Sequence, residues 1–267
     1  MSYIGKVREE ARQFEKLTNE GPIKSLTAFV SFPSTLNRDG SGVFRGEPEF
    51  YDVPLNPSVF RELFKDGEDL MAREIGEIKK ARSIYQSKKI SDKYLNAFAP
   101  HMHDDDLNWL FFARHVGRDT RLLDVSWNPL VALYFACGGV PENDGVVYFF
   151  FGRNFRPVKK GYSDWLDRRD FPILPISFKE FLSSEFDQRV ENTPYLVAPD
   201  LPQERILAQN GAFFLWKDPE MRPAAEKQLI PAVIDGDSKH EIRSDLAAFG
   251  ISKQSLFPNE KPAKSGA

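Results

Sequence analysis

Three polar residues stand inside segments that otherwise read as buried strands. Arg45 lies in SGVFRGEPEF, and Asp124 and Ser126 lie in TRLLDVS. A charge in such a place costs stability unless it is paired or used to bind a ligand. A guanidinium group forks onto phosphate oxygens and stays charged, so Arg45 is a candidate for binding a polyanion. The alternative is a structural ion pair with a neighbouring acid.

Asp124 and Ser126 point to the same face if TRLLDVS is a strand, because side chains alternate along a strand. Arg121 then points to the opposite face. The Asn128-Pro129 pair that follows predicts the start of a helix, whose free N–H groups could help to bind a ligand. The alternative is that Asp124 and Ser126 only cap this helix, while Arg121 pairs with Asp124 or another acid.

Two other patterns contain side chains that could bind a metal or act as a catalytic triad, but each has a simpler explanation. HMHDDD at 101–106 directly precedes a predicted helix, which favours capping and a solvated turn over a metal site. His115 with Asp124 and Ser126 could suggest a hydrolase triad, but the chain has no Gly-x-Ser-x-Gly elbow. We therefore expect no metal. His115 is either a core histidine or a hydrogen-bond donor in a pocket.

Hydrophobic spacing predicts the elements that must position these side chains. Apolar residues at steps of three and four predict a helix over 2–19, and helices over 58–98 broken at Gly67 and Gly76. Further helices are predicted at LNWLFFARHVG, LVALYFA and KHEIRSDLAAFG. Strands are predicted at LTAFVSF, around Arg45, and at TRLLDVS, DGVVYFFFG and KQLIPAVID, with a hairpin about Asn210-Gly211 in RILAQNGAFFLW. Helices gather in the first half and strands in the second, which is typical of an α+β fold.

Composition limits the class of protein. The 267 residues are 41% hydrophobic and include 23 Phe, enough for a sizeable core. Lys and Arg number 36 against 39 Asp and Glu, so no basic excess indicates nucleic acid as a partner. Cys137 is the single cysteine, and neither a signal peptide nor a run of about 18 apolar residues occurs. We expect a cytoplasmic protein that does not associate with membranes.

Five blocks of the sequence resemble the FRG domain, a family named for the Phe-Arg-Gly near its start. The blocks are FRGE at 44–47, PSVFR at 57–61, LNWLFFARHVGRDTRLLDVSWNPLVALYFA at 107–136, RILAQNGAFF at 205–214 and GISKQSLFP at 250–258. Arg114 stands where the family usually has glutamine, and Asp119 replaces a usual proline. The resemblance implies an N-terminal helix over 1–24 and an FRG domain over 25–258. Residues 259–267 are expected to form a disordered tail.

The order of these motifs also resembles ADP-ribosyltransferases. There an early strand ends in aromatic-Arg-Gly, a later strand ends in Ser-Thr-Ser before a helix, and a last strand carries a catalytic glutamate. Phe44-Arg45-Gly46, Asp124-Val125-Ser126 and the stretch from Glu204 to Phe213 follow this order. The resemblance implies an α+β fold with a split, antiparallel-rich sheet flanked by helices. It also implies NAD as a candidate substrate, held by Arg45, Gly46, Arg121, Ser126, His115 and Gln209.

The sequence has no glutamate at the position where ADP-ribosyltransferases carry their catalytic carboxylate. Cleavage of the nicotinamide–ribose bond passes through an oxocarbenium-like state, which a nearby carboxylate stabilises. The alignment puts Arg205 where the glutamate would stand, and Glu204 would point to the other face of a strand. Asp124 is the only other acid in a suitable element. We therefore assign catalytic roles to Asp124, Arg205 and Arg45.

Together these features predict an NAD-utilising ADP-ribosyltransferase or NAD glycohydrolase, acting as a toxin or defence effector in a bacterium or phage. Its partners would be a nucleotide ligand and a macromolecular acceptor, either protein or nucleic acid. The alternative is a non-catalytic module that binds a nucleotide, a nucleic acid or a protein. A purely structural interaction protein would follow if Arg45 and Arg205 were paired only with buried acids.

Overall fold

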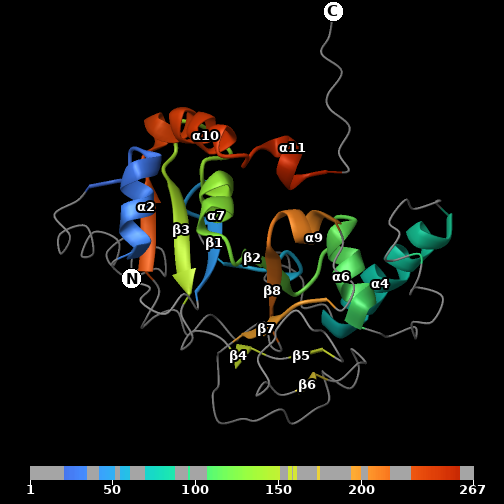
Figure 1. Cartoon of the computed structure of the whole chain (residues 1–267). Helices are drawn as coiled ribbons and strands as arrows, with labels where there is room; N and C mark the ends of the chain where they lie inside the picture. Colours follow the sequence, from blue (N-terminus) through green and yellow to red (C-terminus); the bar gives the residue numbers. More distant parts are fainter. Residues whose placement is uncertain are drawn as a thin grey trace, which may run out of the picture.

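The computed structural model describes residues 21–34, 42–51, 55–60, 70–87, 96, 107–150, 156–157, 159–160, 173–174, 194–199, 204–216 and 230–258. Figure 1 shows helices and strands interleaved along the chain. The helices are α2 (Leu26–Ser34), α4 (Leu70–Ser87), α6 (Leu107–His115), α7 (Pro129–Ala136), α9 (Glu204–Ala208), α10 (Lys239–Ala248) and α11 (Lys253–Leu256). The strands are β1 (Val43–Glu47), β2 (Leu122–Ser126), β3 (Gly145–Phe150), β4 (Arg156–Pro157), β5 (Lys159–Lys160), β6 (Ile173–Leu174), β7 (Tyr195–Val197), β8 (Gly211–Leu215) and β9 (Ile230–Ile234).

The main sheet runs in the order β4-β7-β8-β2-β1-β3-β9 and is antiparallel except for the β4–β7 pair. Strand β1 pairs with β3 along its whole length, and β2 pairs in the same way with β8. Between β1 and β2 the register is limited to one pair, Phe44 with Ser126. The α+β class is therefore confirmed. The expected split is present only as this weak junction between two halves of a continuous sheet.

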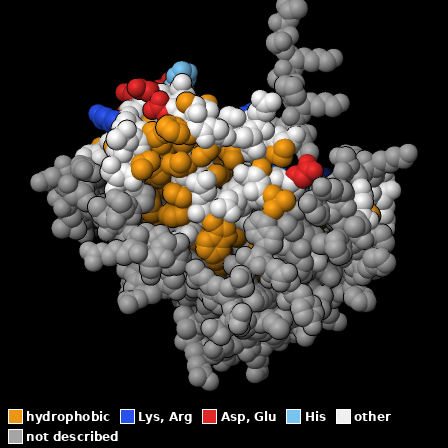
Figure 2. All heavy atoms as spheres, viewed as in Figure 1, with side chains coloured by type: hydrophobic (Ala, Val, Ile, Leu, Met, Phe, Trp, Pro, Cys, Tyr) orange, Lys and Arg blue, Asp and Glu red, His pale blue; other side chains and the backbone are white. Residues whose placement is uncertain are grey.

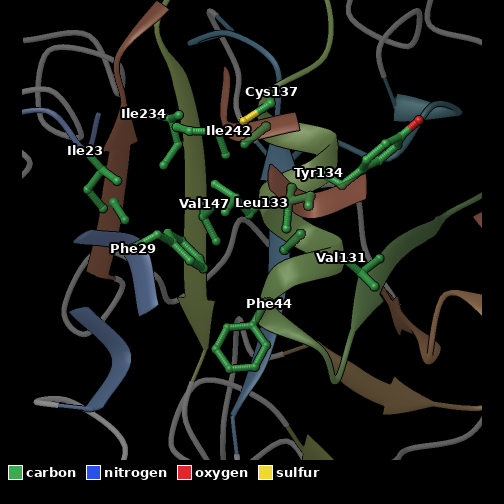
Figure 3. Packing of buried hydrophobic residues seen from close by; sticks show 14 of the residues in the cluster. Ile23, Phe29, Phe44, Val131, Leu133, Tyr134, Cys137, Val147, Ile234 and Ile242 are labelled. Atoms are coloured by element: carbon green, nitrogen blue, oxygen red, sulfur yellow. The ribbon is translucent and has the colours of Figure 1, made fainter. Parts of the chain in front are cut away.

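The described helices pack on one face of the sheet in two groups; Figure 1 shows α2, α7 and α10 to the left of its centre and α4, α6 and α9 to the right. Helices α2, α7, α10 and α11 cover β1, β3 and β9, while α4, α6 and α9 cover β2, β7 and β8. In the first group Phe29, Phe44 and Val147 belong to one buried cluster with residues of α7 (Figure 3). Phe29 is fully buried, and burial of such a side chain contributes about 1.5–3 kcal/mol. Figure 2 shows hydrophobic side chains gathered below the charged side chains of α10, in the region of α7.

Helix α7 lies unusually close to the sheet because glycines face it. A Cβ atom at Gly46 would lie 1.8 Å from the carbonyl oxygen of Ala132, and one at Gly145 would lie 2.2 Å from that of Ala136. The start of α7 follows the sequence prediction, since the Asn128 side chain accepts a hydrogen bond from the N–H of Leu130 at 2.9 Å. The helix is thus fixed both at its N-terminus and along its buried side.

The prediction of a strand at LTAFVSF is wrong, because this segment forms α2. Ser25 starts the helix, since its Oγ atom accepts a hydrogen bond from the N–H of Ala28 at 3.2 Å. Leu26 and Phe29, three residues apart, are buried, whereas Val30 is 53% exposed. This is the spacing of one helix face. The serine cap outweighs the β propensity of the aromatic and branched residues that follow.

The predicted hairpin about Asn210-Gly211 is also wrong in its first arm, which forms α9. The N–H of Gln209 donates to the carbonyl of Arg205, and that of Asn210 donates to Leu207, both at 3.0 Å. Asn210 has a φ of 44°, the left-handed conformation that commonly ends a helix. Arg205 therefore lies on a helix rather than on the late strand that we expected.

Most of the remaining predictions are confirmed, one is wrong, and some concern segments outside the described residues. Strands β1, β2, β3 and β9 and helices α6, α7 and α10 lie where the sequence predicts them, whereas Gly76 does not interrupt α4. The predicted helix over 2–19, the HMHDDD segment and the tail over 259–267 lie outside the described residues. None of the helices described is long and apolar enough to cross a bilayer.

Candidate functional site

A cleft of about 380 Å³ opens at the weak junction between β1 and β2. Arg45, Asp124, Ser126, Arg205 and Gln209 all line it, so residues from β1, β2 and the α9 segment meet there. The volume lies within the range of about 300–1,000 Å³ that is typical of small-molecule sites. The structure thus brings together on one cleft most of the residues that the sequence selected.

Arg45 connects β1 to β2 through its guanidinium group. Its Nη1 atom donates to the backbone carbonyl oxygen of Asp124 at 2.7 Å, and its Nε atom donates to Oε1 of Glu47 at 3.0 Å. Glu47 is buried and also accepts a hydrogen bond from the N–H of Leu55 at 3.2 Å. Arg45 is therefore both an ion-pair partner and a cleft residue. Its Nη2 atom has no hydrogen-bond partner among the described residues.

Asp124 is held by Arg114, which projects from the last turn of α6. The Nε atom of Arg114 donates to Oδ2 of Asp124 at 2.9 Å, and its Nη2 atom donates to the same oxygen. Desolvation acts to raise the pKa of Asp124, but the charge and hydrogen bonds of Arg114, with the charges of Arg45 and Arg205, lower it overall. The carboxylate is therefore ionised at neutral pH. Its Oδ1 atom has no hydrogen-bond partner in the described part of the chain.

The ion pair also affects Arg114. Desolvation acts to lower the pKa of Arg114, but the charge and hydrogen bonds of Asp124 raise it above the ordinary value. Arg114 thus remains a cation under all ordinary conditions. It adds a third guanidinium group to the wall of the cleft.

Arg205 and Gln209 reach the cleft from the α9 segment. The guanidinium carbon of Arg205 lies 4.8 Å from the ring centroid of Phe257, a cation–π contact. Its N–H groups make no hydrogen bond to the described residues, so they are available to a ligand. Gln209 is fixed by a hydrogen bond of 3.1 Å from its Nε2 atom to the carbonyl of Leu256.

Ser126 lines the cleft but its hydroxyl group is engaged by the backbone. Its Oγ atom donates to the carbonyl of Gln209 at 2.7 Å and accepts from the N–H of Asn128 at 3.0 Å. The hydroxyl therefore ties the end of β2 to the turn before β8 and to the start of α7. This arrangement is close to the structural alternative considered for Ser126 in the sequence.

Arg121, which we expected to bind the cofactor, directly precedes β2 and is not among the described residues that line either hollow of the site. Its Nε atom donates to both carboxylate oxygens of Glu74, at 3.0 and 2.8 Å, and its Nη1 atom donates to the carbonyl of Trp216 at 3.1 Å. Both charged side chains are fully buried. The guanidinium group of Arg121 is thus engaged by Glu74 and Trp216 rather than by Asp124.

Gly46 was also expected to make room for a ligand. It lines the cleft, yet the space beside its Cα atom is filled by the backbone of α7 at Ala132 and Ala136. The absence of a side chain at Gly46 is thus required by the helix that walls the cleft.

A smaller hollow of about 180 Å³ borders the cleft. Both are lined by Arg114, Asp124, Val125, Arg205 and Gln209. His115 lines only the smaller one, and its ring stacks on that of Phe112 with 6.3 Å between centroids. The structure therefore places His115 next to the main cleft rather than in it. No group of three or more His, Cys, Asp or Glu within the described residues could hold a metal ion.

Residues 40–145 match the family model of the FRG domain. The chain contains an FRG domain. The match includes Arg45, Arg114, Asp124 and Ser126, whereas Arg205 and Gln209 follow it in the sequence. The wider extent of the FRG domain, over 25–258, stays a prediction. No curated protein and no solved structure matches the chain.

Two site residues within the FRG domain were not selected from the sequence. Glu47 shares a strand face with Arg45 because the two are separated by one residue, and this alternation was a usable signal. Arg114 stands in the last turn of a predicted helix, where we expected a departure from the family pattern. That departure signalled a change in the site, but only the packing of α6 beside β2 shows that Asp124 is the partner.

Proposed function

We propose that the cleft binds a nucleotide of the NAD class and that Asp124 assists cleavage of its bond between nicotinamide and ribose. The chain would then be an NAD-utilising ADP-ribosyltransferase or an NAD glycohydrolase. The observation that carries this proposal is the convergence of Arg45, Asp124 and Arg205, from three separate elements, on one cleft. A role as a toxin or defence effector would depend on this activity.

The arginines account for the binding step. Arg45, Arg114 and Arg205 face the cleft, and of the nearby carboxylates Glu47 pairs with Arg45 and Asp124 with Arg114. Three guanidinium groups against two carboxylates leave an excess of positive charge. Guanidinium groups bind phosphate oxygens in pairs, so a pyrophosphate fits the free donors of Arg45 and Arg205.

The state of Asp124 suits this particular bond cleavage. When the bond from C1′ to the nicotinamide nitrogen breaks, the electron pair goes to that nitrogen, and the positive charge of the ring moves to the ribose. Nicotinamide leaves neutral, so no general acid is needed. An ionised carboxylate stabilises the oxocarbenium-like ribose. A water molecule or an acceptor group then attacks C1′ and loses its proton.

A second function is favoured by one contact of the same residue. Oδ2 of Asp124 receives two hydrogen bonds from Arg114, which offset much of its charge. An ionised carboxylate whose charge is balanced by Arg114 would leave the cleft able to bind a nucleotide without cleaving it. The cleft would then act as a nucleotide-recognition module.

The two functions are separated by incubating the purified protein with NAD, alone and with cell lysate, and measuring released nicotinamide and labelled acceptor. Under the enzyme proposal, wild type releases nicotinamide, Asp124→Asn does not, and Asp245→Asn, a change of an exposed acid on α10, behaves as wild type. Absence of both products with wild type would contradict the enzyme proposal. Thermal stabilisation by ADP-ribose, with NAD left intact, would support the recognition module. If neither ADP-ribose nor NAD stabilises the protein and no product forms, both proposed functions are excluded.

A further inference from the structure

We propose that the smaller hollow is a second anion subsite, which takes a phosphate monoester group of the same nucleotide beyond its pyrophosphate. The inference rests on the proposed binding of a nucleotide in the larger cleft and names the class of nucleotide, one with a third phosphate group. Two guanidinium groups and an imidazole ring line this hollow, from Arg114, Arg205 and His115. Among the described residues that line it, Asp124 is the only acid.

Donors in this hollow remain available for an anion. Arg114 uses its Nε and Nη2 atoms for Asp124, and its Nη1 atom has no hydrogen-bond partner among the described residues. Arg205 lines both hollows and makes no hydrogen bond to the described residues. Because arginine forks match phosphate oxygens, the two side chains can hold one phosphate between them.

The size and position of the hollow fit a phosphate group rather than a whole nucleotide. Its volume of about 180 Å³ is several times the share of one water molecule in the liquid, about 30 Å³. It lies below the range of about 300 Å³ and more that is typical of sites for whole small molecules. Since the two hollows share lining residues, one ligand can extend from the cleft into both.

The test compares two pairs of nucleotides that differ by one phosphate, NAD with NADP and ADP with ATP, by calorimetric titration at fixed salt. The titrations use Asp124→Asn protein, which should not cleave the nucleotide. The change also removes the negative charge of Asp124, which would lose its partner when Arg114 is replaced. The third phosphate should tighten binding about tenfold in at least one pair, the value of a charge-assisted hydrogen bond. The pair that shows the preference reveals where on the ligand the phosphate stands.

Adding Arg114→Gln to Asp124→Asn should remove this preference, so that the affinities for the two nucleotides of the pair agree within about twofold. Arg118→Gln in the same background is the matched control, because Arg118 follows the end of α6 and is not among the described residues that line either hollow. Equal affinities within both pairs, or a preference that survives without Arg114, would overturn the subsite while leaving the proposed function standing. If no nucleotide binds, the proposed function fails. Titration with inorganic phosphate then decides the subsite, which stands only if phosphate binds and Arg114→Gln weakens it.

Discussion

The Nη1 atom of Arg45 donates a hydrogen bond of 2.7 Å to the backbone carbonyl oxygen of Asp124. This contact crosses the junction between β1 and β2, which pair at a single position among the described residues, Phe44 with Ser126. A side chain thus supplements backbone pairing where the two halves of the sheet meet. A ligand that binds Arg45 would act directly on this junction.

Replacing Arg45 with Met should lower the free energy of unfolding by about 2–3 kcal/mol, because buried Glu47 loses its charged partner. Urea unfolding measures the change. The double variant Arg45→Met with Glu47→Leu should recover most of the stability but not the binding of ADP-ribose. A single variant as stable as wild type would show that the ion pair contributes little.

Replacing Gly46 with Ala should destabilise the protein by about 3 kcal/mol or more, because the new Cβ atom would lie 1.8 Å from the carbonyl oxygen of Ala132. Gly76→Ala is the matched control. Gly76 lies in α4 with no atom within 4 Å of such a Cβ atom, so the change should stabilise the helix by about 0.5–1 kcal/mol. Thermal unfolding of both variants checks the two signs, and equal effects would argue against the close packing of α7.

Replacing Glu74 with Gln should cost about 3 kcal/mol of stability, because the charge of Arg121 would stay buried without its carboxylate. Glu74→Leu combined with Arg121→Met should restore much of the loss. Once the protein is folded, neither variant should change the affinity for ADP-ribose, since the pair lies away from the cleft. A large loss of affinity for ADP-ribose in the double variant would show that Arg121 contributes to ligand binding.

The pH dependence of stability should report the ion pair of Asp124 with Arg114. The folded-state pKa of Asp124 lies below its ordinary value of about 3.9, so the pair stabilises the fold above that pH. Its contribution is lost as the pH falls through the lowered pKa. The Asp124 side chain is 39% exposed, so we expect less than about 1 kcal/mol. The difference in stability between wild type and Asp124→Asn should stay constant from pH 7 to about 5 and shrink below about 4. A decline that begins near pH 6 would indicate a raised pKa instead.

The strands and helices that the sequence predicted correctly have strong local signals. Alternation in TRLLDVS and the Asn128-Pro129 start of α7 are such cases. The two segments that were misassigned, LTAFVSF and RILA, are short helices whose residues also suit strands. A serine cap decided the first, and the left-handed Asn210 decided the second.

The sequence predicted which residues line the site better than it predicted the contacts between them. The structure pairs Asp124 with Arg114, and it pairs Arg121 with Glu74, which lies 47 residues away in the sequence. No local pattern identifies a pair at that distance in sequence. Arg114 was missed for the same reason, because its contact with Asp124 depends on how α6 packs beside β2.

The strand order also bears on how the protein can be divided. Residues 40–145 match the FRG domain, but within them β1, β2 and the first residue of β3 are the only described parts of the main sheet. A fragment cut at these limits would leave β2 without β8 and would remove nearly all of β3. Its strands would expose unpaired N–H and C=O groups, which promote aggregation. Expression of the domain therefore requires the later strands, and boundaries drawn from the family match alone should yield insoluble protein.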